Sequence, residues 1–276
     1  MIIMYYADCH SHSKYSFDVG DEPWSQIDAL CEAAIKAGMS ELAVTDHYEV
    51  NGVVEWGERA DPVSAAKDIE AAREKYSDRL RISFGIELGQ AEEYPSHVYD
   101  LISSMNFDYV LGSLHNLPGR QDFCGYDYGK MDQDSIERLF EASLRYLTML
   151  CDFKQINTIA HITYMHRYVT EYGRDIDFKK HYASIGDFFR KMIQSGKSLE
   201  INTSTMREGG DRTLPGMELV KYYRELGGEM VTCGSDTHGT AFVGTGIRRA
   251  YELLKEAGFR YITVFHEGKP VMMKID

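Results

Sequence analysis

The chain has 276 residues, of which 43% are hydrophobic and 12% are aromatic, so it is able to bury a sizeable core. Its formal net charge of −13 disfavours binding of long nucleic acid, which depends on a basic surface. No segment reaches the roughly 18 consecutive apolar residues of a membrane span, and residues 1–6 lack the basic region of a signal peptide. The five cysteines form no Cys-x-x-Cys pair, which is typical of a reduced, cytoplasmic protein.

Short apolar runs alternate with helical patterns along the chain. Eight runs have the composition of strands. They cover residues 4–10, 41–45, 81–87, 109–114, 158–161, 198–202, 229–233 and 261–265. Between them, apolar residues recur at helical spacing over 23–37, before Gly38, and over 134–150. Asp61-Pro62 is a helix start, and further helices are expected over 178–196, 215–227 and 246–258.

Strands that alternate with helices indicate a parallel sheet with helices outside it. Seven or eight such repeats with no sign of a linker favour one closed α/β barrel over residues 1–276. An open, doubly wound sheet is the alternative, but no Gly-x-Gly-x-x-Gly turn follows any predicted strand.

Metal-binding side chains follow the predicted strands where a barrel carries its functional groups, at the C-terminal ends. Six of the ten histidines lie there: His10, His12, His47, His115, His161 and His238. Alternation on a strand would also bring Asp8 to the face of His10 and His12. Imidazole and carboxylate groups are ligands of zinc, iron and manganese, so the sequence predicts a site for several metal ions.

Six short motifs occur in order along the chain. They are Asp-x-His-x-His at 8–12, Thr-Asp-His at 45–47, Gly-x-Glu at 85–87, Gly-Ser-x-His at 112–115, Ala-His at 160–161 and Ser-Asp-x-His at 235–238. This ordered set resembles the polymerase and histidinol phosphatase (PHP) superfamily of metal-dependent phosphoesterases. The resemblance implies a distorted (β/α)7 TIM-like barrel that holds two or three divalent ions.

The resemblance also implies a ligand set. It gives His10, His12, Glu87 and Asp236 to the first metal; Glu87, His115 and His161 to the second; and Asp18, His47 and His238 to the third. Many members have histidine where this chain has Asp18, and without that ligand the site would hold two metals. We expect Asp18 to be a ligand, and the metals to be zinc, iron or manganese.

Other polar residues near these motifs receive supporting or structural roles. We expect Asp8 and Asp46 to accept hydrogen bonds from ligand histidines, although Asp46 could instead begin a helix. The histidines outside the motifs, namely His97, His166, His181 and His266, are expected to be structural. Cys9 and Cys233 alternate away from the ligand face and are interpreted as packing residues.

Hydrolysis of a phosphate ester needs a nucleophile, which two bridged metals supply, and a proton for the leaving alkoxide. Asp18, His47 and His238 are the candidates for the general acid, and the sequence does not choose among them; Asp236 is the fourth catalytic candidate. An arginine in each of two loops, Arg167 and Arg207, resembles the phosphate clamp of the histidinol-phosphatase branch. Arg120 and Arg212 are weaker candidates.

The resemblance implies hydrolysis of L-histidinol phosphate to L-histidinol and phosphate in histidine biosynthesis. The expected partner is therefore a small phosphate monoester, with no membrane. One alternative is a PHP-type phosphoesterase acting on nucleotides or short oligonucleotides. A second alternative is a non-catalytic module that the metals stabilise. Neither metal identity nor oligomeric state is predicted by the sequence.

Overall fold

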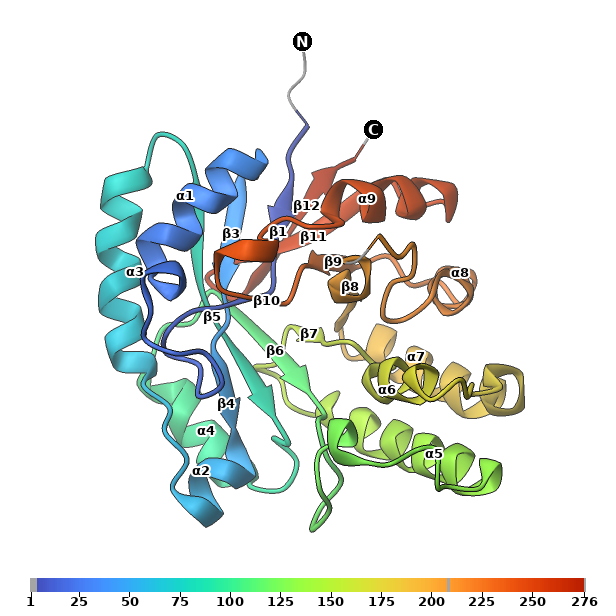
Figure 1. Ribbon diagram of the computed structural model, residues 1–276. Coiled ribbons are helices and arrows are strands. Elements are labelled where there is room, and N and C mark those ends of the chain that lie inside the picture. Colours follow the sequence, from blue (N-terminus) through green and yellow to red (C-terminus); the bar gives the residue numbers. More distant parts are fainter. Residues whose placement is uncertain (1–3, 208, 276) are drawn as a thin grey trace.

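Seven parallel strands follow one another in chain order around a barrel wall, with the helices on its outside (Figure 1). The computed structural model describes residues 4–207 and 209–275. The wall consists of β1 (Ala7–Asp8), β3 (Glu41–Val44), β5 (Arg81–Gly89), β6 (Tyr109–Ser113), β7 (Thr158–Ile159), β8 (Ser198–Asn202) and β9 (Val231–Gly234). A short strand, β4 (His47–Glu49), pairs with the second half of β5. The predicted (β/α)7 barrel is confirmed.

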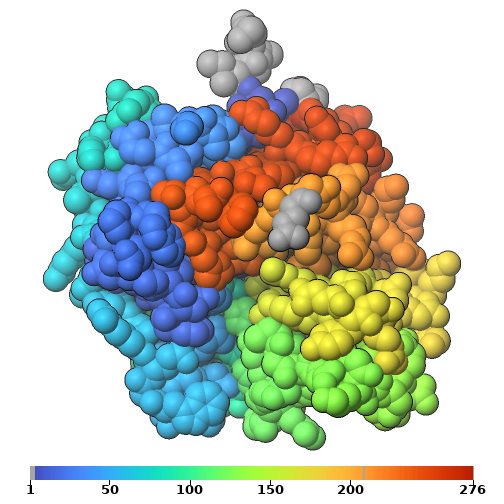
Figure 2. Space-filling view, in the orientation of Figure 1, coloured from blue at the N-terminus to red at the C-terminus, as the bar shows by residue number. Residues whose placement is uncertain are grey.

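The two ends of the chain close the barrel. Strand β2 (Ser11–His12) pairs in parallel with β10 (Thr237–His238), which places His12 opposite His238. The Cys9 amide donates to the Cys233 carbonyl at 2.8 Å. Figure 2 shows the resulting contact as blue N-terminal residues lying against orange and red C-terminal residues. The first and seventh strands are therefore neighbours, as the barrel prediction requires.

Nine α-helices occur in the described part of the chain. They are α1 (Ile27–Ala37), α2 (Val50–Trp56), α3 (Pro62–Tyr76), α4 (Pro95–Ser104), α5 (Gln133–Leu150), α6 (Tyr164–Glu171), α7 (Tyr182–Gln194), α8 (Met217–Glu225) and α9 (Ile247–Glu256). The predicted helix boundaries at Gly38 and Asp61 are present. Gly38 ends α1 in the left-handed conformation, at φ 74°, and the Asp61 side chain accepts a hydrogen bond from the Ser64 amide at the start of α3. None of these helices is long and apolar enough to cross a membrane.

The strands predicted at the two ends of the chain differ from a regular barrel repeat, the first in extent and the last in its place. Residues 4–10 do not form one strand, because β1 ends at Asp8 and β2 begins only at Ser11. The predicted strand 261–265 corresponds to β11 (Tyr261–His266), which lies outside the barrel and pairs antiparallel with β12 (Lys269–Lys274). A two-residue turn at Glu267-Gly268, with φ of 51° and 72°, makes this hairpin possible.

A buried carboxylate holds the hairpin and the chain start to the barrel wall. Glu41, 1% exposed at the start of β3, accepts hydrogen bonds from the Tyr5 hydroxyl at 2.6 Å and the Ser83 hydroxyl at 2.7 Å. Nε2 of His266, on β11, lies 3.0 Å from the same carboxylate. His266 is thus structural, in agreement with its position on the last predicted strand.

We expect Glu41→Ala to lower the free energy of unfolding by about 3 kcal/mol, because it leaves three polar groups without their buried acceptor. Urea denaturation measures the change. The matched control, Glu74→Ala, removes an exposed carboxylate from α3 and should change stability by less than about 0.5 kcal/mol. Equal effects of the two substitutions would contradict this role of Glu41.

Candidate metal centre

A single buried carboxylate, that of Glu87 on β5, lies among five imidazoles and is 0% exposed. Its two oxygens face different rings. Oε2 lies 3.1 Å from Nε2 of His10, 3.5 Å from Nε2 of His12 and 3.0 Å from Nδ1 of His47, whereas Oε1 lies 2.9 Å from Nε2 of His161 and 3.3 Å from Nε2 of His115. One carboxylate thus touches rings that come from five different places in the sequence.

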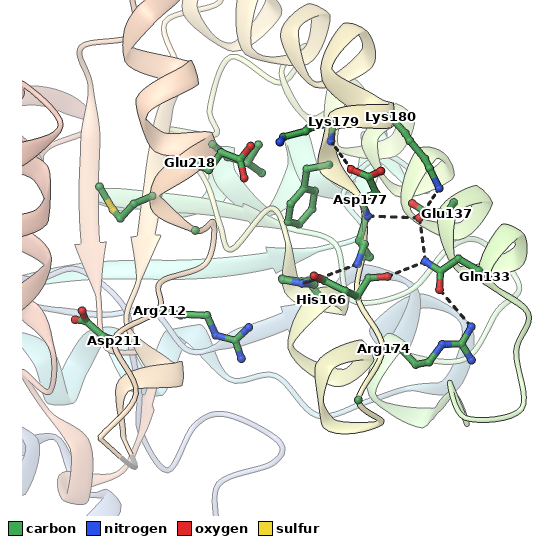
Figure 3. Close-up of a pocket in the computed structure, with 17 residues that line it drawn as sticks. Gln133, Glu137, His166, Arg174, Asp177, Lys179, Lys180, Asp211, Arg212 and Glu218 are labelled. Carbon is green, nitrogen blue, oxygen red and sulfur yellow. Dashed lines mark hydrogen bonds and ion pairs between the residues drawn. The ribbon is translucent and has the colours of Figure 1, made fainter.

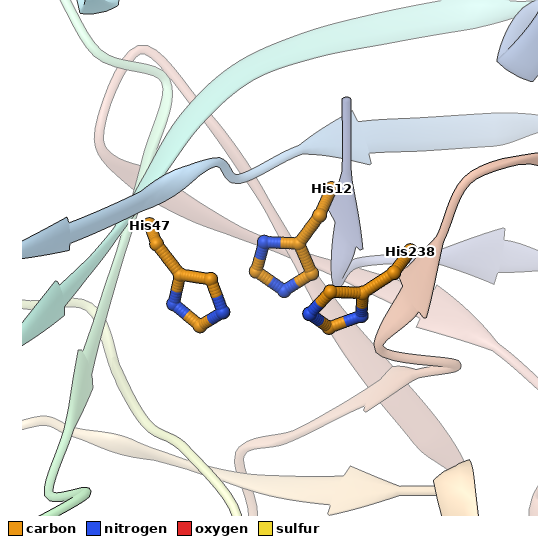
Figure 4. Close-up of side chains that lie close together, drawn as sticks. All are labelled: His12, His47 and His238. Carbon is orange, nitrogen blue, oxygen red and sulfur yellow. The ribbon is translucent and has the colours of Figure 1, made fainter. Parts of the chain in front are cut away.

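The closure of the barrel brings three of the rings together. His12 from β2, His47 from β4 and His238 from β10 point toward a common centre (Figure 4). The ring centroid of His12 lies 4.2 Å from that of His47 and 4.3 Å from that of His238. Such close packing of three imidazoles is favourable when they share a cation, which their neutral forms bind.

Four sets of three residues have possible ligand atoms within 4.8 Å of one another. They are His12, His47 and His238; His10, His161 and Asp236; His10, His12 and Glu87; and His47, Glu87 and His115. These sets contain eight of the nine predicted ligands. They overlap, so they do not separate into the three groups that the sequence resemblance implies.

Asp18, the ninth predicted ligand, lies at the outer edge of this cluster. Its Oδ2 is 2.8 Å from Nε2 of His238 and 3.7 Å from Nε2 of His47, and its side chain is 35% exposed. Although partial burial raises its pKa, the hydrogen bond to His238 and the charge of His47 hold the pKa of Asp18 below its ordinary value. The carboxylate is therefore ionised and faces the two rings with which the sequence grouped it.

The donor atoms fit divalent metal ions. Nε2 of His12 and Nδ1 of His47 are buried and make no hydrogen bond of good geometry, although oxygens of Asp236 and Glu87 lie 3.3 and 3.0 Å away. Burial, together with the charges of His47 and His238, lowers the pKa of His12 well below its ordinary value, so its ring is neutral. Neutral imidazoles and carboxylates are the donors that zinc, iron and manganese accept.

The acidic residues of the cluster keep their charge despite burial. Burial alone would raise the pKa of Glu87, but the charges of His10, His47 and His115 hold it well below its ordinary value. The pKa of Asp236 is likewise lowered, with His10 and His12 outweighing burial. Ionised carboxylates are the form that binds a cation.

Glu200, on β8, supports the cluster from behind and was given no role by the sequence analysis. Its Oε1 lies 2.6 Å from Nδ1 of His10, which directs Nε2 of that ring toward Glu87. Its Oε2 accepts from the His161 amide at 2.7 Å. Close packing also explains Gly234, because a Cβ there would lie 2.3 Å from Cβ of His10. Glu200 could have been identified from the sequence by strand alternation, which places it on the same face as Asn202.

Glu49, on β4, has the corresponding position behind two other rings and was also missed. Its Oε1 lies 2.9 Å from Nδ1 of His115 and 3.4 Å from Nδ1 of His47. Burial opposes ionisation, but the charge of His115 outweighs it and lowers the pKa of Glu49 to about 2. Glu49 could have been identified from the sequence, because it lies two residues after His47 on one short strand and therefore shares its face.

Asp8 does not orient a histidine ring, and that prediction is wrong. Its carboxylate accepts from the amide and hydroxyl of Ser235, at 2.8 and 2.6 Å, and from the Gly244 amide at 2.8 Å. The physical reason is the interruption of the strand after Asp8, which ends the alternation that would have brought it beside His10 and His12. Asp8 fixes the backbone that follows β9.

Asp46 reaches a ligand histidine only through a hydroxyl. It accepts from the amide and hydroxyl of Ser13, at 2.6 and 2.8 Å, and from the Ser16 hydroxyl at 3.2 Å. The same Ser16 oxygen lies 3.1 Å from Nδ1 of His12. Asp46 begins no helix, because β4 starts at the next residue.

Both predicted phosphate-binding arginines line one cavity of about 530 Å³. Arg207 follows the short 3-10 helix η4 (Ser204–Met206), and Arg167 lies on α6. Arg212 lines the same cavity, whereas Arg120 is exposed and lines neither this cavity nor the neighbouring one.

Like the arginine cavity, the neighbouring cavity, of about 850 Å³, contains none of the nine predicted ligands among its described lining residues (Figure 3). His166 lies in the wall that it shares with the arginine cavity, and its Nε2 is 2.7 Å from Oδ1 of Asp175. Two other histidines outside the motifs also have partners away from the metal cluster. His97 pairs with Tyr48, and His181 pairs with Glu137 and Glu141. Cys9 and Cys233 are free and buried, in agreement with a packing role.

Comparisons with known proteins relate the chain to one family. The PHP domain family matches residues 8–204. The histidinol-phosphatase of Lactococcus lactis is 25% identical over 271 residues, which cover 98% of this chain and 96% of that protein. A probable histidinol-phosphatase of Thermotoga maritima is 29% identical over 269 residues, covering 96% of this chain and 97% of that protein.

A solved structure shares the fold. The crystal structure of histidinol phosphate phosphatase from Lactococcus lactis, complexed with zinc, L-histidinol and phosphate, has a TM-score of 0.82 and 24% sequence identity, and the match covers 97% of this chain and 99% of that chain. Because the family match extends over most of the chain and contains five of the six ordered motifs, this chain belongs to the PHP domain family.

Proposed function

We propose that this chain is a metal-dependent phosphatase that hydrolyses L-histidinol phosphate to L-histidinol and phosphate. The observation that carries the proposal is the gathering of eight predicted ligands in one cluster, with five imidazoles around the two oxygens of Glu87. The substrate is supported by the names of relatives that match this chain over nearly their whole length.

The nine predicted ligands divide between two or three divalent ions, which are zinc, iron or manganese. Glu87 would be shared by two ions, since its Oε2 faces His10, His12 and His47 while its Oε1 faces His115 and His161. Asp236 would complete the set of His10 and His12, and Asp18 would hold a third ion with His47 and His238. When bound, the ions supply a nucleophile at neutral pH and withdraw charge from the phosphoryl oxygens.

The residues around these ions bind the substrate and move its proton. Arg167 and Arg207 present planar guanidinium groups from one cavity, a shape that matches phosphate oxygens. Asp18 and His238 are the candidates best placed to pass a proton from bound water to the leaving alkoxide, because they are 2.8 Å apart and about one third exposed. His47 is enclosed, at 10% exposure, and is less able to reach a leaving group.

We infer that residues 1–276 form one domain that acts on a small phosphate monoester in the cytoplasm. The relatives have nearly the same length as this chain, which supports one domain. Five free cysteines, four of them buried, support a reducing compartment.

Phosphate release distinguishes the candidate substrates. We expect the metal-loaded protein to hydrolyse histidinol phosphate with a kcat/KM at least about 100-fold above that for any nucleoside monophosphate, since a few differing contacts are worth that factor. A preference for a nucleotide or a short oligonucleotide would favour the nucleotide alternative. Bound metal without hydrolysis of any ester would favour the non-catalytic module.

Glu87→Gln should lose metal and activity together, because it removes the charge that both metal positions share. We expect metal affinity to fall by more than the roughly 10–100-fold that a supporting hydrogen bond contributes. Elemental analysis after dialysis measures it. The matched control is Glu92→Gln: burial raises the pKa of Glu92 to about 8, so its side chain is mostly neutral and the amide should keep wild-type metal content. Retention of metal by Glu87→Gln would refute the bridge.

Arg167→Met should raise KM for histidinol phosphate by about 10-fold or more and leave the metal content unchanged, since a hydrogen bond to a charged group contributes about 1.5–3 kcal/mol. Steady-state kinetics and elemental analysis give the two readouts. Arg120→Met removes an exposed arginine outside both cavities and serves as the control. Unchanged kinetics of Arg167→Met would exclude it from phosphate binding.

A further inference from the structure

Asp236 has a backbone conformation that its surroundings must enforce. Its φ is 53°, in the left-handed region that residues other than glycine rarely adopt. This conformation follows directly after β9 and brings Oδ1 of Asp236 to 3.3 Å from Nε2 of His12 and 3.8 Å from Nε2 of His10. The position of a predicted metal ligand therefore depends on what stabilises one strained peptide.

Four neighbours, including His238 with its Nδ1 3.1 Å from the carbonyl oxygen, hold Asp236. Its amide donates to the His10 carbonyl at 2.8 Å, and Oδ2 of its carboxylate accepts from Nδ2 of Asn202 at 3.2 Å. Its carbonyl accepts from Nη2 of Arg207, which also donates to the Ser235 carbonyl at 3.0 Å. One guanidinium nitrogen thus binds two successive carbonyls, those of the two peptide units that flank Asp236.

Arg207 is itself fixed in place. Its guanidinium lies over the ring of Phe242, with its carbon 5.0 Å from the ring centroid. Its Nε is buried and makes no hydrogen bond within the described chain, so one donor of the guanidinium is left unpaired beside the cavity that the residue lines. The same side chain therefore contacts the ligand-bearing segment with one nitrogen and keeps another free.

Arg167 lacks the backbone contacts of Arg207 and is therefore its matched control. It lines the same cavity, but its guanidinium makes no hydrogen bond or ion pair with any described residue and lies 5.7 Å from the ring centroid of Tyr168. Both arginines line the same cavity, and of the two only Arg207 touches the backbone of a predicted metal ligand.

We propose that Arg207 is a positioning residue that holds Asp236 in its metal-binding geometry, in addition to facing the phosphate. This inference rests on the proposed function in one respect, namely that Asp236 is a metal ligand. Its consequence is that Arg207 contributes to metal affinity when no substrate or phosphate is present, whereas Arg167 does not.

The test compares zinc binding by wild type, Arg207→Met, Arg207→Lys and Arg167→Met in phosphate-free buffer. Competition with a chromogenic chelator gives the affinity, and circular dichroism verifies that each apo-protein is folded. We expect Arg207→Met to bind at least one zinc ion about 10–100-fold more weakly, the usual cost of losing a supporting contact. Arg207→Lys should recover part of that loss, because an ammonium group also donates to carbonyls. Arg167→Met should bind zinc as the wild type does.

Kinetics provide a second readout. Both Met variants should raise KM, but only Arg207→Met should also lower kcat at limiting zinc and recover it when zinc is in excess. Wild-type zinc affinity in Arg207→Met, or an equal loss in Arg167→Met, would overturn the inference. If Arg207→Met does not fold, Arg207→Lys takes its place, and wild-type zinc affinity in that variant has the same consequence. Zinc binding that depends on Arg207 in a protein that hydrolyses no ester would refute the function and leave the inference intact.

Discussion

The charge of Glu87 is the constraint on which the other features of the site depend. A carboxylate with no exposed surface is costly to bury unless opposite charges surround it. Here the compensation comes from imidazoles carried by β2, β4 and the ends of β1, β6 and β7, so all of these strands must end at the same place. A barrel satisfies that requirement because its parallel strands all present their C-terminal ends at one mouth.

Closure of the barrel also forms part of the metal site. The parallel pairing of β2 with β10 places His12 opposite His238, and the Asp236 amide is bound by the His10 carbonyl. Neither end of the chain would form this part of the site alone. The absence of a side chain at Gly234 permits the approach, since a Cβ there would collide with His10 and with Glu200.

The sequence predicted the features that depend on local spacing. Histidines that directly follow an apolar run had to lie at the barrel mouth, and His12, His47 and His238 do. What depends on the relation between strands could not be predicted. Asp8 shares the spacing of His10 and His12 but not their face, because the strand is interrupted after it. The carboxylate behind His10 is instead Glu200, 190 residues away, and only the register of β8 against the neighbouring strands reveals it.

Charge also determines the order in which this site assembles. Glu87, Asp236 and Asp18 are all held ionised by their neighbours, and the whole chain carries a net charge of −13. A phosphate monoester is an anion, so these carboxylates repel it until cations reverse the local sign. On the proposed function, metal binding therefore precedes substrate binding, and a residue such as Arg207, which contacts both the ligand-bearing backbone and the cavity, acts in both steps.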